Sequence, residues 1–176
     1  MPTIISDEGN VQARLVSLGC NPPTEVALLP TNLMTAESRN DLKYPTTAPT
    51  VRTLWRDAGI PESRIEPAGA KYPLAGQKGF EGWVAPTIFL SAAFLSHNAS
   101  AAAIALNVIS NYVSDFLKGF PANERKMSCD IVVEIKPGAV YKRVRYSGDP
   151  KGLSEVPAVV EALVKGGGGE VGPDDH

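Results

Sequence analysis

The sequence is poor in the side chains that most often bind metals or act as catalytic bases. It holds two histidines, His97 and His176, and two cysteines, Cys20 and Cys129, dispersed over 176 residues. This spacing matches no zinc motif, so neither a catalytic triad nor a multi-histidine metal centre is expected. A cysteine more often serves as a small buried hydrophobe than as a nucleophile. We therefore assign no catalytic, cofactor-binding or metal-binding residue, and no cofactor.

An excess of one charge sign and a targeting segment are also missing. The 17 basic residues are balanced by 19 acidic ones. That balance argues against both a strongly basic nucleic-acid-binding protein and a disordered chain. The opening MPTIISDEGN lacks the basic start and the apolar segment of a secretory signal, and the cysteines lack CxxC spacing. These features predict a reduced protein of the cytoplasm.

Charged residues are absent from Trp83 to Ser114. A membrane span needs about 20 consecutive, mainly apolar residues. The apolar block 83–95 is shorter and is followed by SHNAS, and the next block contains Asn107 and Asn111. A membrane span is therefore not expected. The segment 86–95 is either a buried strand or the start of a helix, because the period of a short apolar run does not separate the two.

Residues 98–118 are predicted to form a long central helix, covered on most sides. The segment is rich in Ala and Leu and has no internal Gly or Pro. A narrow polar seam runs along one side of this helix, formed by Ser100, Asn107, Asn111, Ser114 and Lys118. Such a seam is either the exposed stripe of a buried helix, which base rates favour, or the lining of a small-ligand pocket.

The clearest helical pattern covers residues 49–61. An apolar stripe falls at helical spacing, and it is formed by Val51, Leu54, Trp55 and Ala58. On the same pattern Arg52, Arg56 and Asp57 face away from the core. Gly59 provides the left-handed residue that ends the helix, and Pro61 prevents its continuation.

Shorter signals surround this helix. Residues 24–30 read as a buried strand that ends at Pro30, and residues 63–69 as a short strand. The segments 31–48 and 68–82 have no regular period and are predicted to be long irregular loops, the first with at most one helical turn.

Pro137-Gly138 separates two alternating runs and predicts a β-hairpin with a type II turn. A two-residue loop places Ile131 opposite Val144 and Ile135 opposite Val140 on a core face. The other face is expected to be wet, with these cross-strand pairs: Asp130 with Arg145, Val132 with Arg143, and Glu134 with Tyr141.

The chain is expected to end in a helix and a tail. The helix follows the hairpin, and its inward residues are Leu153, Val156, Val160, Leu163 and Val164. Residues 1–165 are predicted to form a single globular domain, and residues 166–176 a flexible, glycine-rich acidic tail. The order of elements predicts an α/β or α+β domain with a mixed sheet, a long central helix, and a C-terminal β-hairpin plus helix.

One cluster could support phosphate chemistry. Glu134-Ile135-Lys136 has the E-x-K spacing that two-metal nucleases use on a strand, and Asp130 projects from the same face. Ordinary cross-strand pairing with Arg143 and Arg145 explains the same residues and is favoured, because acidic-x-basic triplets are common on solvated hairpins.

Two functions from different classes remain. The leading hypothesis is a non-enzymatic regulatory or adaptor domain that acts through protein-protein contacts in an intracellular assembly, with a protein partner or as a homo-oligomer. Exposed Phe80, Trp83 or Phe94 would favour it. The alternative is a small nucleotide- or nucleic-acid-handling enzyme or sensor with a Mg²⁺ site on the 130–145 hairpin. A phosphate would then meet Lys136, Arg143 and Arg145, or a loop that carries Lys71 and Lys78.

Overall fold

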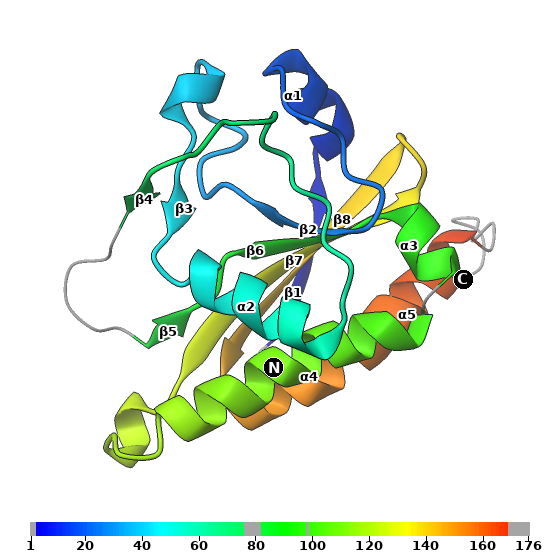
Figure 1. Ribbon diagram of the computed structural model, residues 1–176. Helices are drawn as coiled ribbons and strands as arrows, with labels where there is room; N and C mark the ends of the chain where they lie inside the picture. The colour runs from blue at the N-terminus through cyan, green and yellow to red at the C-terminus, as the bar shows by residue number, and fades with distance from the viewer. Residues whose placement is uncertain (1–2, 76–81, 98, 169–176) are drawn as a thin grey trace.

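A mixed β-sheet forms the centre of the protein, and the computed structural model describes residues 3–75, 82–97 and 99–168 (Figure 1). The strands are β1 (Thr3–Glu8), β2 (Val26–Leu29), β3 (Tyr44–Pro45), β4 (Leu74–Ala75), β5 (Trp83–Val84), β6 (Thr87–Leu90), β7 (Met127–Lys136) and β8 (Val140–Gly148). The α-helices are α1 (Val11–Ser17), α2 (Ala48–Ala58), α3 (Ala92–His97), α4 (Ala99–Phe116) and α5 (Val156–Gly168). Short 3-10 helices are η1 (Arg39–Asp41), η2 (Ala122–Glu124) and η3 (Pro150–Glu155). The mixed α/β class is confirmed.

The main sheet has the strand order β1-β8-β7-β6-β2, and β5 also pairs with β7. The pairs of β7 with β5 and β6 are parallel, whereas β1–β8, β7–β8 and β2–β6 are antiparallel. Strands β3 and β4 form a separate parallel pair. The path therefore ends in β1 on one side and in β2 on the other.

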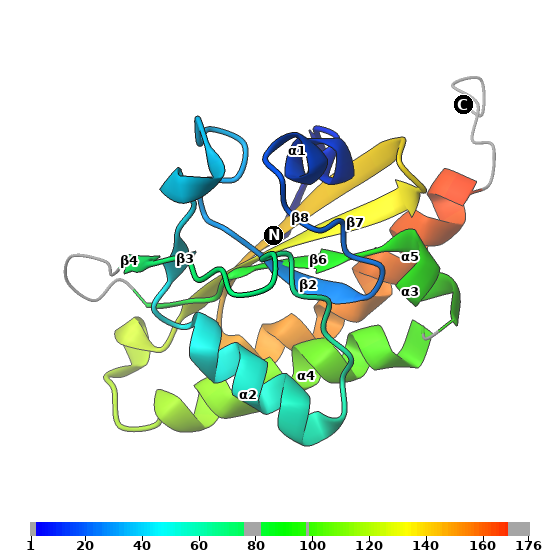
Figure 2. The ribbon, with the colours of Figure 1, turned by 45° about the horizontal axis from the view of Figure 1, so that its top comes forward.

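Both faces of the sheet carry a hydrophobic core. On the first, called the helix face, Leu28, Ile88 and Ile131 pack in one cluster with residues of α2, α4 and α5. On the second, called the loop face, Phe89 and Val132 pack against α1 and the irregular segments around it. Figure 2 shows α2, α4 and α5 beneath the sheet and α1 above it. The expectation that the second face of the hairpin is simply wet is therefore wrong.

The C-terminal hairpin has most of the predicted register. Ile131 lies opposite Val144, and the three pairs predicted for the other face are also present. Gly138 has a φ of 66°, as the third residue of a type II turn requires, and the Ala139 N–H donates to the Lys136 carbonyl at 2.9 Å. The pairing of Ile135 with Val140 is wrong, because an irregularity between Glu134 and Lys136 places Lys136 opposite Val140.

Helix α2 confirms the predicted helix and its end. Gly59 adopts the left-handed conformation at φ 76°, and the Ile60 N–H donates to the Trp55 carbonyl at 2.9 Å. The buried residues are Ala48, Val51 and Trp55, whereas Ala58 is exposed. The prediction that Arg52 faces away is also wrong. Arg52 is partly buried and pairs with two carboxylates of the segment that follows the helix.

Helix α4 is buried along one side and exposed along the other. Ala105, Leu106, Ile109 and Val113 are fully buried, which places the helix in the core. Its outer side is open, with Ile104 exposed to 46 %, so the helix is less covered than predicted. Within the described ranges, no helix is long and apolar enough to cross a membrane.

The remaining predictions divide into three outcomes. Residues 24–30 contain the predicted strand β2, and residues 86–95 hold both proposed alternatives, because β6 is followed by α3. The strand predicted at 63–69 is wrong, because none of these residues lies in a strand, and the preceding Glu62 forms an isolated bridge to Val26. Helix α5 continues to Gly168, so residues 166–168 of the predicted tail are helical, and the rest of that tail lies outside the described residues.

Candidate functional site

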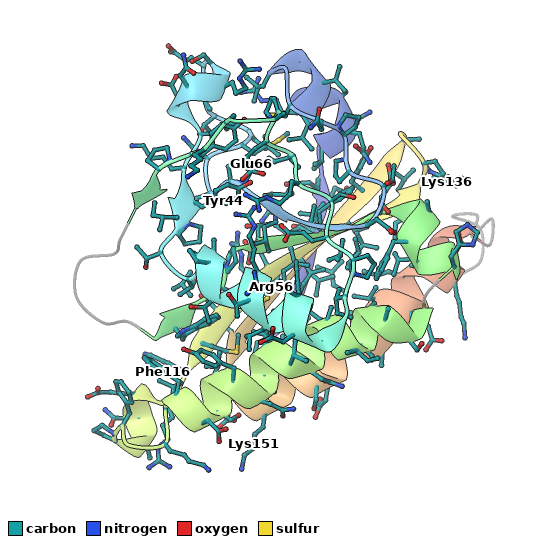
Figure 3. All side chains as sticks on the ribbon, in the orientation of Figure 1. Tyr44, Arg56, Glu66, Phe116, Lys136 and Lys151 are labelled. Atoms are coloured by element: carbon teal, nitrogen blue, oxygen red, sulfur yellow. The ribbon has the colours of Figure 1, made fainter. Side chains whose placement is uncertain are left out.

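Asp130, Glu134 and Lys136 do not converge on one point. Asp130 and Glu134 share a face of β7, but four residues at about 3.3 Å each place them about 13 Å apart. Lys136 lies at the tip of the hairpin, where its side chain is exposed (Figure 3). Within the described residues, no three His, Cys, Asp or Glu side chains are grouped to hold a metal ion. The geometry required for a metal site on this hairpin is therefore missing.

Glu134 is a buried structural residue, and its expected place on a solvated surface is wrong. It is 5 % exposed. One carboxylate oxygen accepts from the Ala92 N–H at 2.9 Å, and the other accepts from the Gly138 N–H and the Tyr141 hydroxyl, both at 3.0 Å. Burial, and then the charge of Glu134, raise the pKa of Tyr141. Glu134 thus joins the turn of the hairpin to the start of α3.

A row of alternating charges crosses the loop face instead. Glu8, Arg143, Asp130 and Arg145 form this charge chain. Arg143 donates to Glu8 at 2.5 Å and to Asp130 at 2.7 Å, and Arg145 donates to Asp130 at 3.1 Å. The hydrogen bond from Arg145 to Asp130, and then the charge of Asp130, raise the pKa of Arg145. The cross-strand interpretation of Asp130 is therefore confirmed, with Glu8 of β1 as a further partner that sequence reasoning missed.

The charge chain lines a groove on the loop face, called the loop-face groove, with a volume of about 960 Å³. Residues of the central strands form its floor, and these are Thr87, Ser128, Asp130, Arg143, Arg145 and Ser147. The segment 29–35, Lys43, Pro45 and Ala75 contribute its wall. The predicted irregular loop 31–48 therefore forms much of one side of the groove.

The lining of the loop-face groove offers hydrogen-bonding and charged groups. Its described residues provide hydroxyls and charges but include no histidine. Cys129 contributes to the lining, yet its side chain is 1 % exposed, and burial raises the pKa of its thiol. A thiol held in its protonated form is a poor nucleophile. The carboxylates among the described lining residues, Glu8 and Asp130, accept from Arg143 and Arg145.

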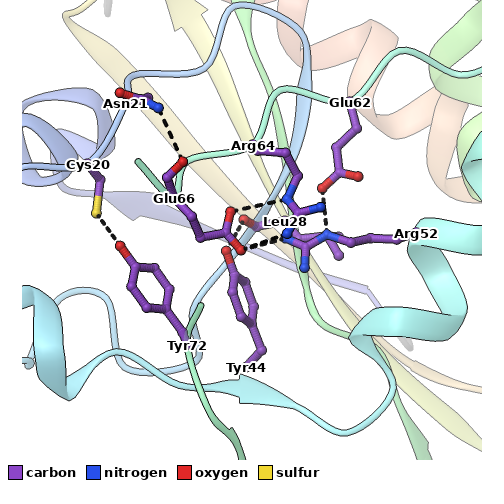
Figure 4. A network of polar contacts seen from close by, with 9 residues as sticks. All are labelled: Cys20, Asn21, Leu28, Tyr44, Arg52, Glu62, Arg64, Glu66 and Tyr72. Atoms are coloured by element: carbon purple, nitrogen blue, oxygen red, sulfur yellow. Dashed lines mark hydrogen bonds and ion pairs between the residues drawn. The ribbon is translucent and has the colours of Figure 1, made fainter. Parts of the chain in front are cut away.

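A second polar cluster lies outside the groove and connects four separate segments (Figure 4). Arg52 of α2 pairs with Glu62 at 2.8 Å and with Glu66 at 3.3 Å, and its guanidinium lies 4.8 Å from the ring centre of Tyr44. Tyr44 stacks on Tyr72. The Tyr72 hydroxyl lies 3.4 Å from the sulfur of Cys20, which sequence analysis had left unassigned.

Contact between opposite charges keeps the Arg and Glu side chains of this cluster ionised although they are partly buried. Burial alone would raise the pKa of Glu66, but hydrogen bonds from Arg64 and the charge of Arg52 lower it overall. Burial also raises the pKa of Tyr44, with Glu66 as a further cause. Each described member has a partner within the protein. The cluster therefore stabilises the packing of α2 on the segment 60–72, and we assign it a structural role.

Trp83 and Phe94, whose exposure would favour a partner surface, are buried. Trp83 is 6 % exposed and Phe94 is 1 % exposed, so both belong to the core, and Phe80 lies outside the described residues. The polar seam on α4 is the expected exposed stripe, because Ser100, Asn107 and Asn111 all face outward. Trp83 and Phe94 therefore do not give the adaptor hypothesis the support that exposed aromatic residues would have given it.

Two exposed apolar side chains lie on β1, a strand that the sequence analysis did not predict. Ile4 is 62 % exposed and Ile5 is 48 % exposed, and the two face opposite sides of the sheet. Ile4 and Ile5 are adjacent and both apolar, so the sequence does not show the alternation of apolar and polar residues that indicates a strand. The signal that could have found the strand is its β-branched start, TII, before the N-cap residue Asn10.

Comparisons with protein-family models, with curated proteins and with solved structures gave no match. The loop-face groove and the exposed strand β1 are therefore the two features from which a function can be argued.

Proposed function

We propose that this protein is a non-enzymatic regulatory or adaptor domain that binds a protein partner by adding a strand to β1. The observation that carries the proposal is the outer edge of β1. This strand pairs with β8 on one side, and no strand among the described residues pairs with its other side. The N–H and C=O groups along such an edge are a template for another extended chain.

The opposite edge of the sheet differs from β1. All four residues of β2 are buried. The segment after α2 runs beside this strand, where Glu62 bridges Val26 and the Ser63 N–H donates to the Val26 carbonyl at 2.8 Å. Protein sheets often protect an edge by covering it in this way. The contrast supports β1 as the edge kept for docking.

The side chains of β1 also support a docking role. Proteins usually protect an exposed edge with charged or proline residues, whereas the centre of β1 carries Ile4 and Ile5. The acidic residues Asp7 and Glu8 at its end are already paired with Lys142 and Arg143 of β8. An incoming strand would cover apolar surface without separating these ion pairs.

Titration with short fluorescent strand-forming peptides tests this proposal. We expect a peptide with alternating Val and Thr residues to bind the wild-type protein and the Ile104→Lys variant, as measured by anisotropy. Ile5→Lys should weaken binding about tenfold or more, since a charge then lies where the peptide covers apolar surface. Ile104 is a matched control because it is exposed to a similar extent, 46 %, on α4.

The same titration contains the result that would contradict strand addition. The titration is repeated with versions of the peptide that carry acidic or basic residues at their ends. If all versions fail to bind, or if Ile5→Lys and Ile104→Lys weaken binding equally, β1 is not the docking element. Far-UV circular dichroism of both variants establishes that each is folded before its binding is compared.

A further inference from the structure

We propose that the strand added to β1 is β1 of a second copy of this chain, paired antiparallel about a two-fold axis at Ile5. This inference rests on the proposed function, because it names the partner of the same edge. For two copies of β1 to pair, the side chains that lie opposite each other must fit and their charges must not repel. The two copies must also place equivalent faces on the same side of the joined sheet.

Geometry limits the choice of register. A continuous antiparallel sheet places opposite residues on the same face, so the two-fold axis must pass between a residue and its own copy. Within β1, the four interior positions Ile4, Ile5, Ser6 and Asp7 could occupy the axis. Only a few of them avoid unfavourable pairs in the sequence TIISDE.

Ladder length and charge select among these registers. An axis at Ile4 pairs only Thr3 to Ile5 of each strand, whereas an axis at Ile5 pairs Thr3 to Asp7. An axis at Asp7 sets two Asp7 carboxylates opposite each other, which is unfavourable. An axis at Ser6 sets Ile5 opposite Asp7 of the second copy, so apolar surface meets a carboxylate. An axis at Ile5 instead places Ile5 opposite Ile5, Ile4 opposite Ser6, and Thr3 opposite Asp7. This register keeps all acidic residues apart and leaves their pairs with β8 intact.

Pairing about Ile5 would cover exposed apolar side chains on both faces of β1. Thr3, Ile5 and Asp7 lie on the helix face, because Ile5 is opposite the buried Val144 of β8. Ile4 lies on the loop face, opposite Arg145. Pairing about Ile5 would therefore cover one isoleucine of each copy on the helix face and one on the loop face. The chain provides apolar contact on both sides of the joined strands.

The joined sheet also extends the loop-face groove. With the axis perpendicular to the sheet, the helix faces of both copies lie on one side and both grooves on the other. Glu8 of β1 and Arg145 of β8 line the groove in each copy. The two charge chains would thus flank the axis on one continuous surface. Since six-residue strands bury little area, we expect a dimer that dissociates on dilution.

A cysteine scan of the full chain tests the register. Thr3, Ile4, Ile5 and Ser6 are each replaced by Cys, with Ile104→Cys as the control, and disulfide-linked dimer is measured after mild oxidation. Cys20 and Cys129 are buried and should not contribute. At Ile5 the two Cα atoms would be about 5 Å apart, within disulfide range, whereas at Ile4 or Ser6 they would be about 8 Å apart.

The expected result is a clear maximum of cross-linked dimer at Ile5→Cys, with little at the other positions. Sedimentation should show that the wild-type protein changes from monomer to dimer as its concentration rises, and that Ile5→Lys stays monomeric. A maximum at another position, equal cross-linking at Ile104→Cys, or a wild-type protein that is monomeric at every concentration would overturn the inference. In the last case, peptide binding to β1 would still support the proposed function, so the two failures are distinguishable.

Discussion

Glu134 shows how strongly the setting of a single residue changes its interpretation. Its spacing from Lys136 suggests a metal ligand or a surface ion pair, yet the carboxylate is buried and accepts from Ala92, Gly138 and Tyr141. A carboxylate is well suited to this position because it has only acceptors. The role of Glu134 therefore follows from three hydrogen-bond donors in three different segments, and not from its spacing to Lys136.

Glu134→Gln is expected to destabilise the protein by about 1–3 kcal/mol. A glutamine has one acceptor oxygen, so its NH₂ group must face either the Ala92 N–H or the Gly138 N–H, and neither can accept a hydrogen bond. Urea unfolding measures the difference, with the exposed Glu124→Gln as the matched control. Equal stabilities for the two variants would contradict the structural role of Glu134.

Glu66 gives a prediction about pH. Its pKa in the folded protein is lowered below the ordinary value of 4.5 despite burial, because Arg64 and Arg52 stabilise its charge. The stabilising contribution of its charge is therefore fully present above pH 4.5 and is lost as the pH falls through the lowered pKa. The sign follows because the unfolded chain binds the proton more readily.

The difference in free energy of unfolding between wild type and Glu66→Gln should accordingly be largest near about pH 7 and shrink toward about pH 3. Urea unfolding at several pH values measures it. A difference that stays constant over that interval would show that the ionised carboxylate contributes nothing beyond the packing of the side chain.

At the scale of the element, α2 shows a helix end that local sequence specifies. Gly59 ends the helix in the left-handed conformation, at φ 76°, and Ile60 then turns back to hydrogen-bond Trp55. Trp55 also donates to the Ala105 carbonyl of α4 at 3.0 Å. The end of α2 thus determines where the chain leaves the helices that cover the helix face.

Gly59→Ala is expected to cost about 1 kcal/mol, because a side chain disfavours the left-handed conformation. Gly119→Ala is the matched control. An added Cβ would meet open space at both positions, but only Gly59 has a positive φ. Thermal or urea unfolding of the two variants separates backbone strain from crowding. A loss of stability at Gly119 as large as that at Gly59 would contradict this explanation.

At the scale of the whole molecule, the two faces of the sheet differ in how they are covered. Helices cover the helix face, whereas α1 and irregular segments cover only part of the loop face (Figure 2). The uncovered part becomes the loop-face groove, with the charge chain along its floor. The edge strand β1 contributes Glu8 to the lining of that groove, and its outer edge pairs with no strand among the described residues, so both proposals concern one region of the molecule.

The sequence by itself determined the elements whose signals are local. Helix α2, the long helix α4 and the turn at Pro137-Gly138 follow from side-chain spacing and from the backbone preferences of Gly and Pro, which act within a few residues. The cross-strand pairs from Asp130 to Glu134 followed once the turn was placed. Even there, the irregularity at Ile135 was missed, because an alternating pattern does not indicate an extra residue.

Only the tertiary structure decided which of these surfaces remain exposed. Trp83 and Phe94 are apolar in any sequence reading, but the sheet and helices that bury them come from distant parts of the chain. Arg52 and Glu134 are polar, yet both are withdrawn from solvent by partners that lie far along the sequence or in another element. Whether a residue is buried depends on the segments that pack against it. These segments are often distant in the sequence, so the periodicity of one segment does not indicate them. For the same reason the open edge of β1 and the loop-face groove became visible only in the folded protein.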